Sequence, residues 1–140
     1  MKKQNYEESK IILEKIRKAK KILINCHRGP DPDAVGSAIA LYLVLTKMGK
    51  QIDIICPSEK LYENVSFLKE YDKIKNKVDF SNFNFLKYDI FITLDSSSWD
   101  MVSSDPNLSL PNINIIVIDH HHTNKNYGEI NLVDKKAAAT

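Results

Sequence analysis

The sequence predicts an α/β fold with three layers, in which a mostly parallel β-sheet lies between two layers of helices. Four short apolar runs alternate little between apolar and polar residues, which is typical of strands buried on both faces. They cover residues 22–26, 51–56, 88–94 and 113–118. A mostly apolar helix is predicted over 34–48, between the first two strands. This strand-helix-strand order favours a parallel pair joined by a right-handed crossover.

An amphipathic helix is predicted before the first strand. Its apolar residues recur at helical spacing among Glu and Lys: Ile11, Ile12, Ile16 and Ala19. The pattern ends near Lys20. Because one side of such a helix is apolar, we expect it to pack on the sheet as a lid.

Local signals define the remaining segments. Asp33 is predicted to cap the start of the apolar helix, and Gly49 to end it. A short helix is predicted over 61–70, whereas 76–87 has the composition of a loop with a few packed aromatic residues. The stretch that begins at Asp134 has the pattern of a capped helix in its first turn.

The composition favours one compact domain. The 140 residues are 43% hydrophobic, enough to build a core, and they contain no internal repeat. A formal net charge of +2 gives no reason to expect a strong nonspecific grip on nucleic acid. Cys26 and Cys56 form no CxxC pair, so a reducing, cytoplasmic location is expected. We expect neither an apolar signal core nor a membrane-spanning segment.

Polar clusters follow three of the predicted strands. His27, Asp31 and Asp33 follow the first; Asp95 follows the third; Asp119, His120 and His121 follow the fourth. The carboxyl ends of parallel strands share one edge of a sheet, where ligands bind. Prolines stiffen the first of these loops, so its two carboxylates can be held in fixed positions. We therefore expect the three clusters to converge on one ligand site.

This mixture of carboxylates and imidazoles, without thiolates, suits manganese, magnesium or iron better than a structural zinc site. Two divalent ions about 3.5 to 4 Å apart would activate a bridging water and stabilise an in-line phosphoryl displacement. Asp95 has the oxygens to bridge both ions, and His27 and His120 would supply one imidazole to each. Phosphoester hydrolysis is the predicted reaction class.

Neighbouring polar residues are expected to support this chemistry. His121 and Arg28 would hold phosphate oxygens, and Asp119 would orient a ligand imidazole rather than bind metal. Ser37 lies where a helix begins and would offer donors to phosphate. For Arg28 an exposed loop charge is an equal alternative. His122 is expected to face solvent as a bystander.

Three motifs resemble those of the DHH phosphoesterases. The segment 27–37, His-Arg-Gly-Pro-Asp-Pro-Asp-Ala-Val-Gly-Ser, resembles the family's HxxPDxDxxGS motif, and 95–97 resembles its second motif. Residues 119–121 are similar to the Asp-His-His that names the family. The resemblance implies two manganese ions. The implied ligands are His27 and Asp31 for one ion, Asp33 and His120 for the other and Asp95 for both, with His121 on the substrate phosphate.

Within the family the chain is most similar to RecJ-like oligoribonucleases that also remove the 3'-phosphate of phosphoadenosine phosphate. This implies a short single-stranded oligonucleotide or a nucleotide phosphate as substrate, and a homodimer as an expected assembly. Family members carry one more metal-binding Asp and then a substrate-binding domain. We therefore expect residues 1–140 to be a truncated N-terminal metal-binding catalytic domain with an incomplete site. The alternatives are a pyrophosphatase or polyphosphatase and a non-catalytic metal- or nucleotide-binding module.

Overall fold

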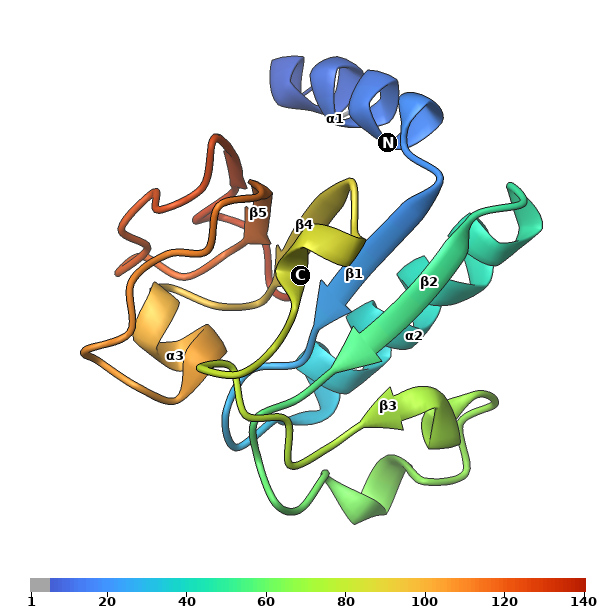
Figure 1. Ribbon diagram of the computed structural model, residues 1–140, viewed down its shortest axis with the longest axis vertical. Coiled ribbons are helices and arrows are strands. Elements are labelled where there is room, and N and C mark those ends of the chain that lie inside the picture. The colour runs from blue at the N-terminus through green and yellow to red at the C-terminus, as the bar shows by residue number, and fades with distance from the viewer. Residues whose placement is uncertain (1–5) are drawn as a thin grey trace.

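The computed structural model describes residues 6–140 and contains a parallel six-stranded sheet between two covering layers (Figure 1). The strand order is β3-β2-β1-β4-β5-β6. The strands are β1 (Lys21–Asn25), β2 (Gln51–Ile55), β3 (Ile74–Lys75), β4 (Ile90–Leu94), β5 (Asn114–Asp119) and β6 (Ile130–Val133). This confirms the predicted α/β fold, and every strand pair in the described residues is parallel.

The chain builds this sheet outward from β1 in two directions. It first adds β2 and β3 on one side, and then returns to add β4, β5 and β6 on the other. Helix α2 (Pro32–Lys47) makes the crossover from β1 to β2. The direction of winding therefore reverses between β1 and β4, and loops at the carboxyl ends of these two strands diverge and leave room for a ligand.

The two faces of the sheet are covered by different kinds of core. Helices α1 (Glu7–Lys18) and α2 cover one face, which is mainly aliphatic. The short helix α3 (Trp99–Ser103) and the loop before β4 cover the other, where Phe80, Phe85 and Phe91 pack together. In Figure 1, α2 lies behind the sheet and α3 in front of it. These layers fix the strand ends between them.

Helix α1 packs on the sheet, as predicted, beside β6. Its residues Ile12 and Ile16, with Ala19 just after the helix, are buried in the aliphatic core, whereas Ile11 is half exposed. A surface ion pair of 3.1 Å joins Lys15 to Glu129. Because such exposed pairs contribute little, the buried isoleucines account for most of the docking of α1.

The cap of α2 differs from the prediction. Asp31, not Asp33, is the N-cap, and its Oδ1 accepts a 3.0 Å hydrogen bond from the Ala34 amide. Pro32 takes the first helical position, which suits its fixed φ and missing N–H, so the cap moves to the residue before it. Asp33 therefore lies within the first turn. The predicted end is confirmed, since Gly49 follows the helix with a φ of +76°.

Other differences lie in short elements. The segment 61–70 has a single 3-10 turn, Glu63–Val65, instead of a helix, because its apolar residues reach the core from irregular backbone. Residues 134–140 form a turn without helix, and their backbone bonds to the site instead. The strands β3 and β6 and the helix α3 were not predicted. Each has five residues or fewer, too short for a periodic pattern.

None of the helices in residues 6–140 has the length and apolar character needed to cross a bilayer.

Candidate metal centre

Asp95 occupies the centre of a cluster of acids and imidazoles at the carboxyl edge of the sheet. It follows β4 directly, is 2% exposed, and has a φ of +53°, in the left-handed region. Its amide donates to the Ile118 carbonyl over 3.0 Å, which extends the β4–β5 ladder by one bond. The strand pairing therefore fixes where this carboxylate points, even though its backbone has left the strand.

One oxygen of Asp95 faces the loop that follows β1. His27 Nε2 lies 3.8 Å from Asp95 Oδ2. His27 Nδ1 is 2.7 Å from the Arg28 carbonyl, which can only accept, so Nδ1 carries the hydrogen and Nε2 is left for a ligand. Asp31 has a carboxylate oxygen within 4.8 Å of the donor atoms of His27 and Asp95. These three side chains form the first candidate metal group.

The other oxygen of Asp95 faces the loop that follows β5. His120 Nε2 lies 3.3 Å from Asp95 Oδ1 and 3.5 Å from Asp33 Oδ2. His120 Nδ1 faces the Ala137 carbonyl at 3.1 Å, so this ring also presents Nε2. Asp95, His120 and His121 form the second candidate group, in which His121 Nδ1 lies 3.6 Å from the same oxygen of Asp95. Asp33 lies beside this group through its contact with His120.

The charges of this cluster are compatible with a bound cation. Burial opposes a charged His27 ring, but the nearby Asp95 carboxylate, the hydrogen bond to the Arg28 carbonyl and the Asp31 charge outweigh it, so the pKa of His27 is raised. The carboxylates around His27 therefore favour its protonated, positively charged ring. A divalent ion would supply that positive charge and release the proton.

The donor atoms of the two groups are oxygen and nitrogen, the set that suits manganese or magnesium. Two thiols lie nearby, but each is turned into the aliphatic core and donates to a carbonyl: Cys26 to Ala34 and Cys56 to His27. Burial raises the pKa of both cysteines, so they remain protonated and are poor metal ligands. The residues present thus fit one divalent ion on each side of Asp95.

Asp119 and His121 form a hydrogen-bonded pair at the edge of this cluster. His121 Nδ1 donates to Asp119 Oδ1 over 2.7 Å, so His121 is the imidazole that Asp119 orients. This hydrogen bond raises the pKa of His121, although partial burial opposes it. His121 Nε2 is then free to donate to an anion in the protonated ring. His122 is exposed and belongs to neither of the candidate metal groups.

The Arg28 side chain contacts residues of α3, and the Ser37 side chain contacts a candidate ligand. The Arg28 guanidinium lies 3.7 Å from Asp100 Oδ2 and 3.3 Å from the Met101 sulfur, on the side of α3. Ser37 donates to Asp33 Oδ1 over 3.2 Å from the next turn of α2. Ser37 therefore supports a candidate ligand, and contact of either residue with substrate phosphate stays a prediction.

Sequence reasoning missed Thr140 and Asn124 as neighbours of this site. Thr140 donates its backbone N–H to Asp33 Oδ2 over 2.9 Å and its hydroxyl to Asp95 Oδ1 over 3.0 Å. Asn124 donates to Asp119 Oδ2 over 2.6 Å. No motif marks either residue, because the fold alone brings these two loop positions to the strand ends.

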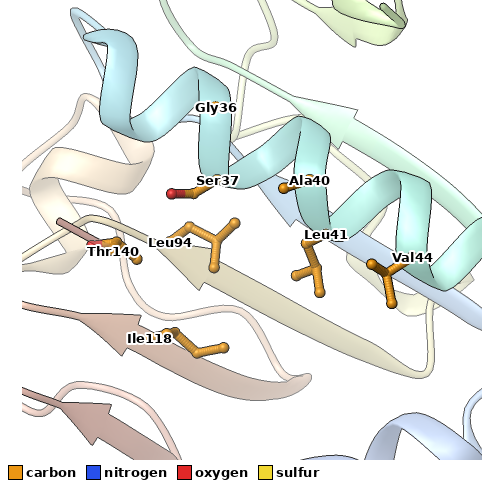
Figure 2. Close-up of a pocket in the computed structure, with 8 residues that line it drawn as sticks. All are labelled: Gly36, Ser37, Ala40, Leu41, Val44, Leu94, Ile118 and Thr140. Atoms are coloured by element: carbon orange, nitrogen blue, oxygen red, sulfur yellow. The ribbon is translucent and has the colours of Figure 1, made fainter. Parts of the chain in front are cut away.

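A groove of about 510 Å³ extends from the cluster along α2. Figure 2 shows Leu41 and Val44 of α2 on one wall and Leu94 and Ile118, from β4 and β5, on the other. Its polar side chains are those of Ser37 and Thr140. Polar chemistry is therefore confined to the end of the groove that adjoins Asp33 and Asp95.

The chain is similar to proteins of one known family. Residues 21–140 match the DHH family, N-terminal domain. The chain is 27% identical over 136 residues to the bifunctional oligoribonuclease and PAP phosphatase NrnA of Thermus thermophilus, covering 96% of this chain and 39% of that protein. It is also 30% identical over 132 residues to the probable bifunctional oligoribonuclease and PAP phosphatase NrnA of Streptococcus mutans. That match covers 93% of this chain and 39% of that protein.

A solved structure has the same fold. The crystal structure of an exopolyphosphatase-related protein from Bacteroides fragilis superposes with a TM-score of 0.86 at 20% identity, covering 99% of this chain and 42% of that one. The chain thus spans about 39% of the length of the two curated relatives named above. The match of fold extends through nearly all of its residues.

Proposed function

The chain belongs to the DHH family, and from that membership we propose that it is a phosphoesterase domain that uses two divalent ions, manganese first and magnesium second. Its proposed substrates are short oligonucleotides or small nucleotide phosphates such as phosphoadenosine phosphate. The observation that carries the proposal is the position of Asp95, which offers one carboxylate oxygen to each of two candidate metal groups.

His27 and Asp31 would hold one ion, Asp33 and His120 the other, and Asp95 would contact both. Bound there, the ions would supply an activated water and stabilise the oxygens of an in-line displacement at phosphorus. The chain's own residues set the geometry. Carbonyl groups fix both ligand imidazoles with Nε2 toward Asp95, so little reorganisation is needed when the site fills.

His121 would contact the substrate. Its ring is held by Asp119 and is less buried than those of His27 and His120, so Nε2 can donate to a non-bridging phosphate oxygen. The raised pKa of His121 favours the protonated ring, which carries both this donor and the one to Asp119. The hydrogen bond would strengthen as charge develops on the phosphoryl oxygens.

The nucleotide preference is supported by the relatives, which are named for oligoribonuclease and PAP phosphatase activities. It is tested by incubating the purified protein with manganese and, separately, a dinucleotide, phosphoadenosine phosphate, pyrophosphate and polyphosphate. We expect the first two to be hydrolysed fastest. Faster hydrolysis of pyrophosphate or polyphosphate would contradict this preference and favour the alternative, a pyrophosphatase or polyphosphatase.

Titration calorimetry with manganese tests the remaining alternative, a non-catalytic metal- or nucleotide-binding module. Binding of manganese without hydrolysis of any of the four compounds would make this chain a non-catalytic metal-binding module. No binding of manganese or magnesium would contradict the two-metal mechanism itself.

A further inference from the structure

We propose that Asn124 is a positioning residue that acts through Asp119 to hold His121 against the substrate phosphate. The inference rests on the proposed function, since it gives His121 a phosphate to contact. Asn124 lies in the loop between β5 and β6, and its side-chain hydrogen bonds in the described structure go to Ser96, Asp119 and Asn126 rather than to a proposed metal ligand.

The first step is the division of the Asp119 carboxylate between two donors. Asn124 Nδ2 donates to Oδ2 over 2.6 Å, and His121 Nδ1 donates to Oδ1 over 2.7 Å. Asp119 is 2% exposed, so water has little access to replace either donor. Rotation of the carboxylate would break both hydrogen bonds. Asn124 therefore fixes the plane of Asp119, and that plane fixes the ring of His121.

The second step is the orientation of the Asn124 amide. Its Oδ1 accepts a 2.7 Å hydrogen bond from the backbone N–H of Asn126, a group that can only donate. The NH2 group must therefore be the end that faces Asp119 and the Ser96 carbonyl, the latter at 3.2 Å. The loop therefore uses the oxygen of this amide and directs its NH2 group toward Asp119 and Ser96.

The third step asks which neighbour depends on Asn124. Tyr127 also donates to the Ser96 carbonyl, over 3.2 Å, so that carbonyl keeps a partner without Asn124. Asp119 Oδ2 has no other side-chain donor among residues 6–140. Because Asp119 is 2% exposed, its Oδ2 would have little access to water to replace the donor if Asn124 were removed. Loss of the Asn124 donor should therefore disturb Asp119 and His121 and leave Asp95 in place.

The variant that tests this is Asn124→Asp, which keeps the size and the acceptor for Asn126 but places an oxygen opposite Asp119. Asn126→Asp is the matched control, because it adds the same charge to the same loop on an exposed residue. We expect Asn124→Asp to lower kcat/KM for a hydrolysed nucleotide about 10- to 100-fold, the usual range for partners that orient functional side chains. The manganese dissociation constant should stay within about twofold, and the control should stay within about twofold in both quantities.

A double-mutant cycle then asks whether Asn124 acts through His121. In a His121→Ala background, the added Asn124→Asp change should alter kcat/KM by less than about twofold, because the group that it positions is gone. An undiminished effect in that background would overturn the proposal. If Asn124→Asp fails to fold, Asn124→Ser is measured in the same cycle, since a hydroxyl keeps one donor, with the same two outcomes.

Nitrogen-15 NMR of the His121 ring, recorded without manganese at one fixed pH, supplies a readout that needs no turnover. The wild-type ring should show one protonated, hydrogen-bonded Nδ1, and Asn124→Asp should shift that signal while Asn126→Asp leaves it unchanged. An unchanged His121 signal in Asn124→Asp would contradict the proposal. Should the wild-type protein hydrolyse nothing, the proposed function fails, and this spectrum still decides whether Asn124 positions His121.

Discussion

Charged side chains at the amino end of the sheet bond to backbone groups, whereas those at the carboxyl end face one another. Before β4, Asp89 Oδ2 accepts from the amides of Lys20 and Lys21, over 2.7 and 2.8 Å. Before β2, the Lys50 ammonium donates to the carbonyls of Arg17 and Ala19 at the end of α1. Each of these charges completes a structural element.

At the carboxyl end, by contrast, Asp95 lies between His27 and His120, and Asp33 lies 3.5 Å from His120. Backbone carbonyls there bond to Nδ1 of His27 and His120, and their Nε2 atoms face carboxylates instead. The same residue types therefore stabilise the fold at the amino end and are positioned to bind a ligand at the carboxyl end. Substitutions at the two ends should therefore separate activity from stability.

The largest expected effect is that of Asp95→Asn. A neutral amide cannot offer an anionic oxygen to both metal groups, so kcat with manganese should fall at least about 10³-fold, or about 4 kcal/mol in the activation barrier. The fold should persist, because Asn tolerates the left-handed backbone found at this position. Steady-state kinetics and a circular-dichroism melt check both. Near-normal turnover would remove Asp95 from the bridging role.

Manganese should stabilise the protein only through the carboxyl end. At a free concentration of 100 times the dissociation constant, binding at one site adds about 2.7 kcal/mol to the free energy of unfolding. Urea denaturation with manganese and with a chelator measures this difference. Asp89→Asn should keep the increment and Asp95→Asn should lose most of it. An equal increment in both variants would place the binding elsewhere.

Asp31 both caps helix α2 and belongs to a candidate metal group, so two substitutions should separate these two roles. Asn caps helices about as well as Asp, whereas Ala removes the cap at a cost of about 1 kcal/mol. We expect Asp31→Asn to retain the wild-type free energy of unfolding and Asp31→Ala to lose that amount, while both weaken manganese binding. Denaturation and calorimetry on the two variants give the comparison. If Asp31→Asn binds manganese normally, Asp31 serves the fold alone.

The smallest effect is expected at the amino end. Asp89→Ala should lower the free energy of unfolding by about 1 kcal/mol or less, since its two hydrogen bonds lie at the surface, and should leave activity unchanged. The Lys21 and Lys20 amides hold the pKa of Asp89 below its ordinary value of 3.8. Its contribution is therefore complete above that value and is lost as the pH falls through the lowered pKa.

Denaturation of the wild type and Asp89→Ala at several pH values checks this sign. The difference between the two proteins should shrink as the pH drops below about 4. A difference that grew on acidification would mean that Asp89 acts through something other than its charged hydrogen bonds.

Much of this architecture could be predicted from the sequence, because strands and helices with strong patterns report their own burial. Four strand predictions agree with β1, β2, β4 and β5 to within two residues at each end. The family motifs also identified the acids and imidazoles that converge at one edge. Prediction from the sequence failed where an element is short, as in β3 and β6, because a few residues at a sheet edge carry no periodic signal.

Local signals also proved ambiguous where two residues compete for one role. Asp31 and Asp33 both precede a helical pattern, and only the position of Pro32 within the helix shows which of them is the cap. The consequence reaches the site, since Asp33 is left to face His120 while Asp31 is shared between the cap and His27.

The α/β class, the buried strand runs and the residue types of a candidate divalent-metal site could all be inferred from the order of residues along the chain. This was possible because burial periodicity and ligand chemistry are properties of nearby residues. Only the tertiary structure decided that Asp95 presents one oxygen to each metal group, that Asp119 serves His121, and that Asn124 holds Asp119. Those relations depend on strand register and on the path of the loop after β5, which bring residues from separate segments within hydrogen-bond distance.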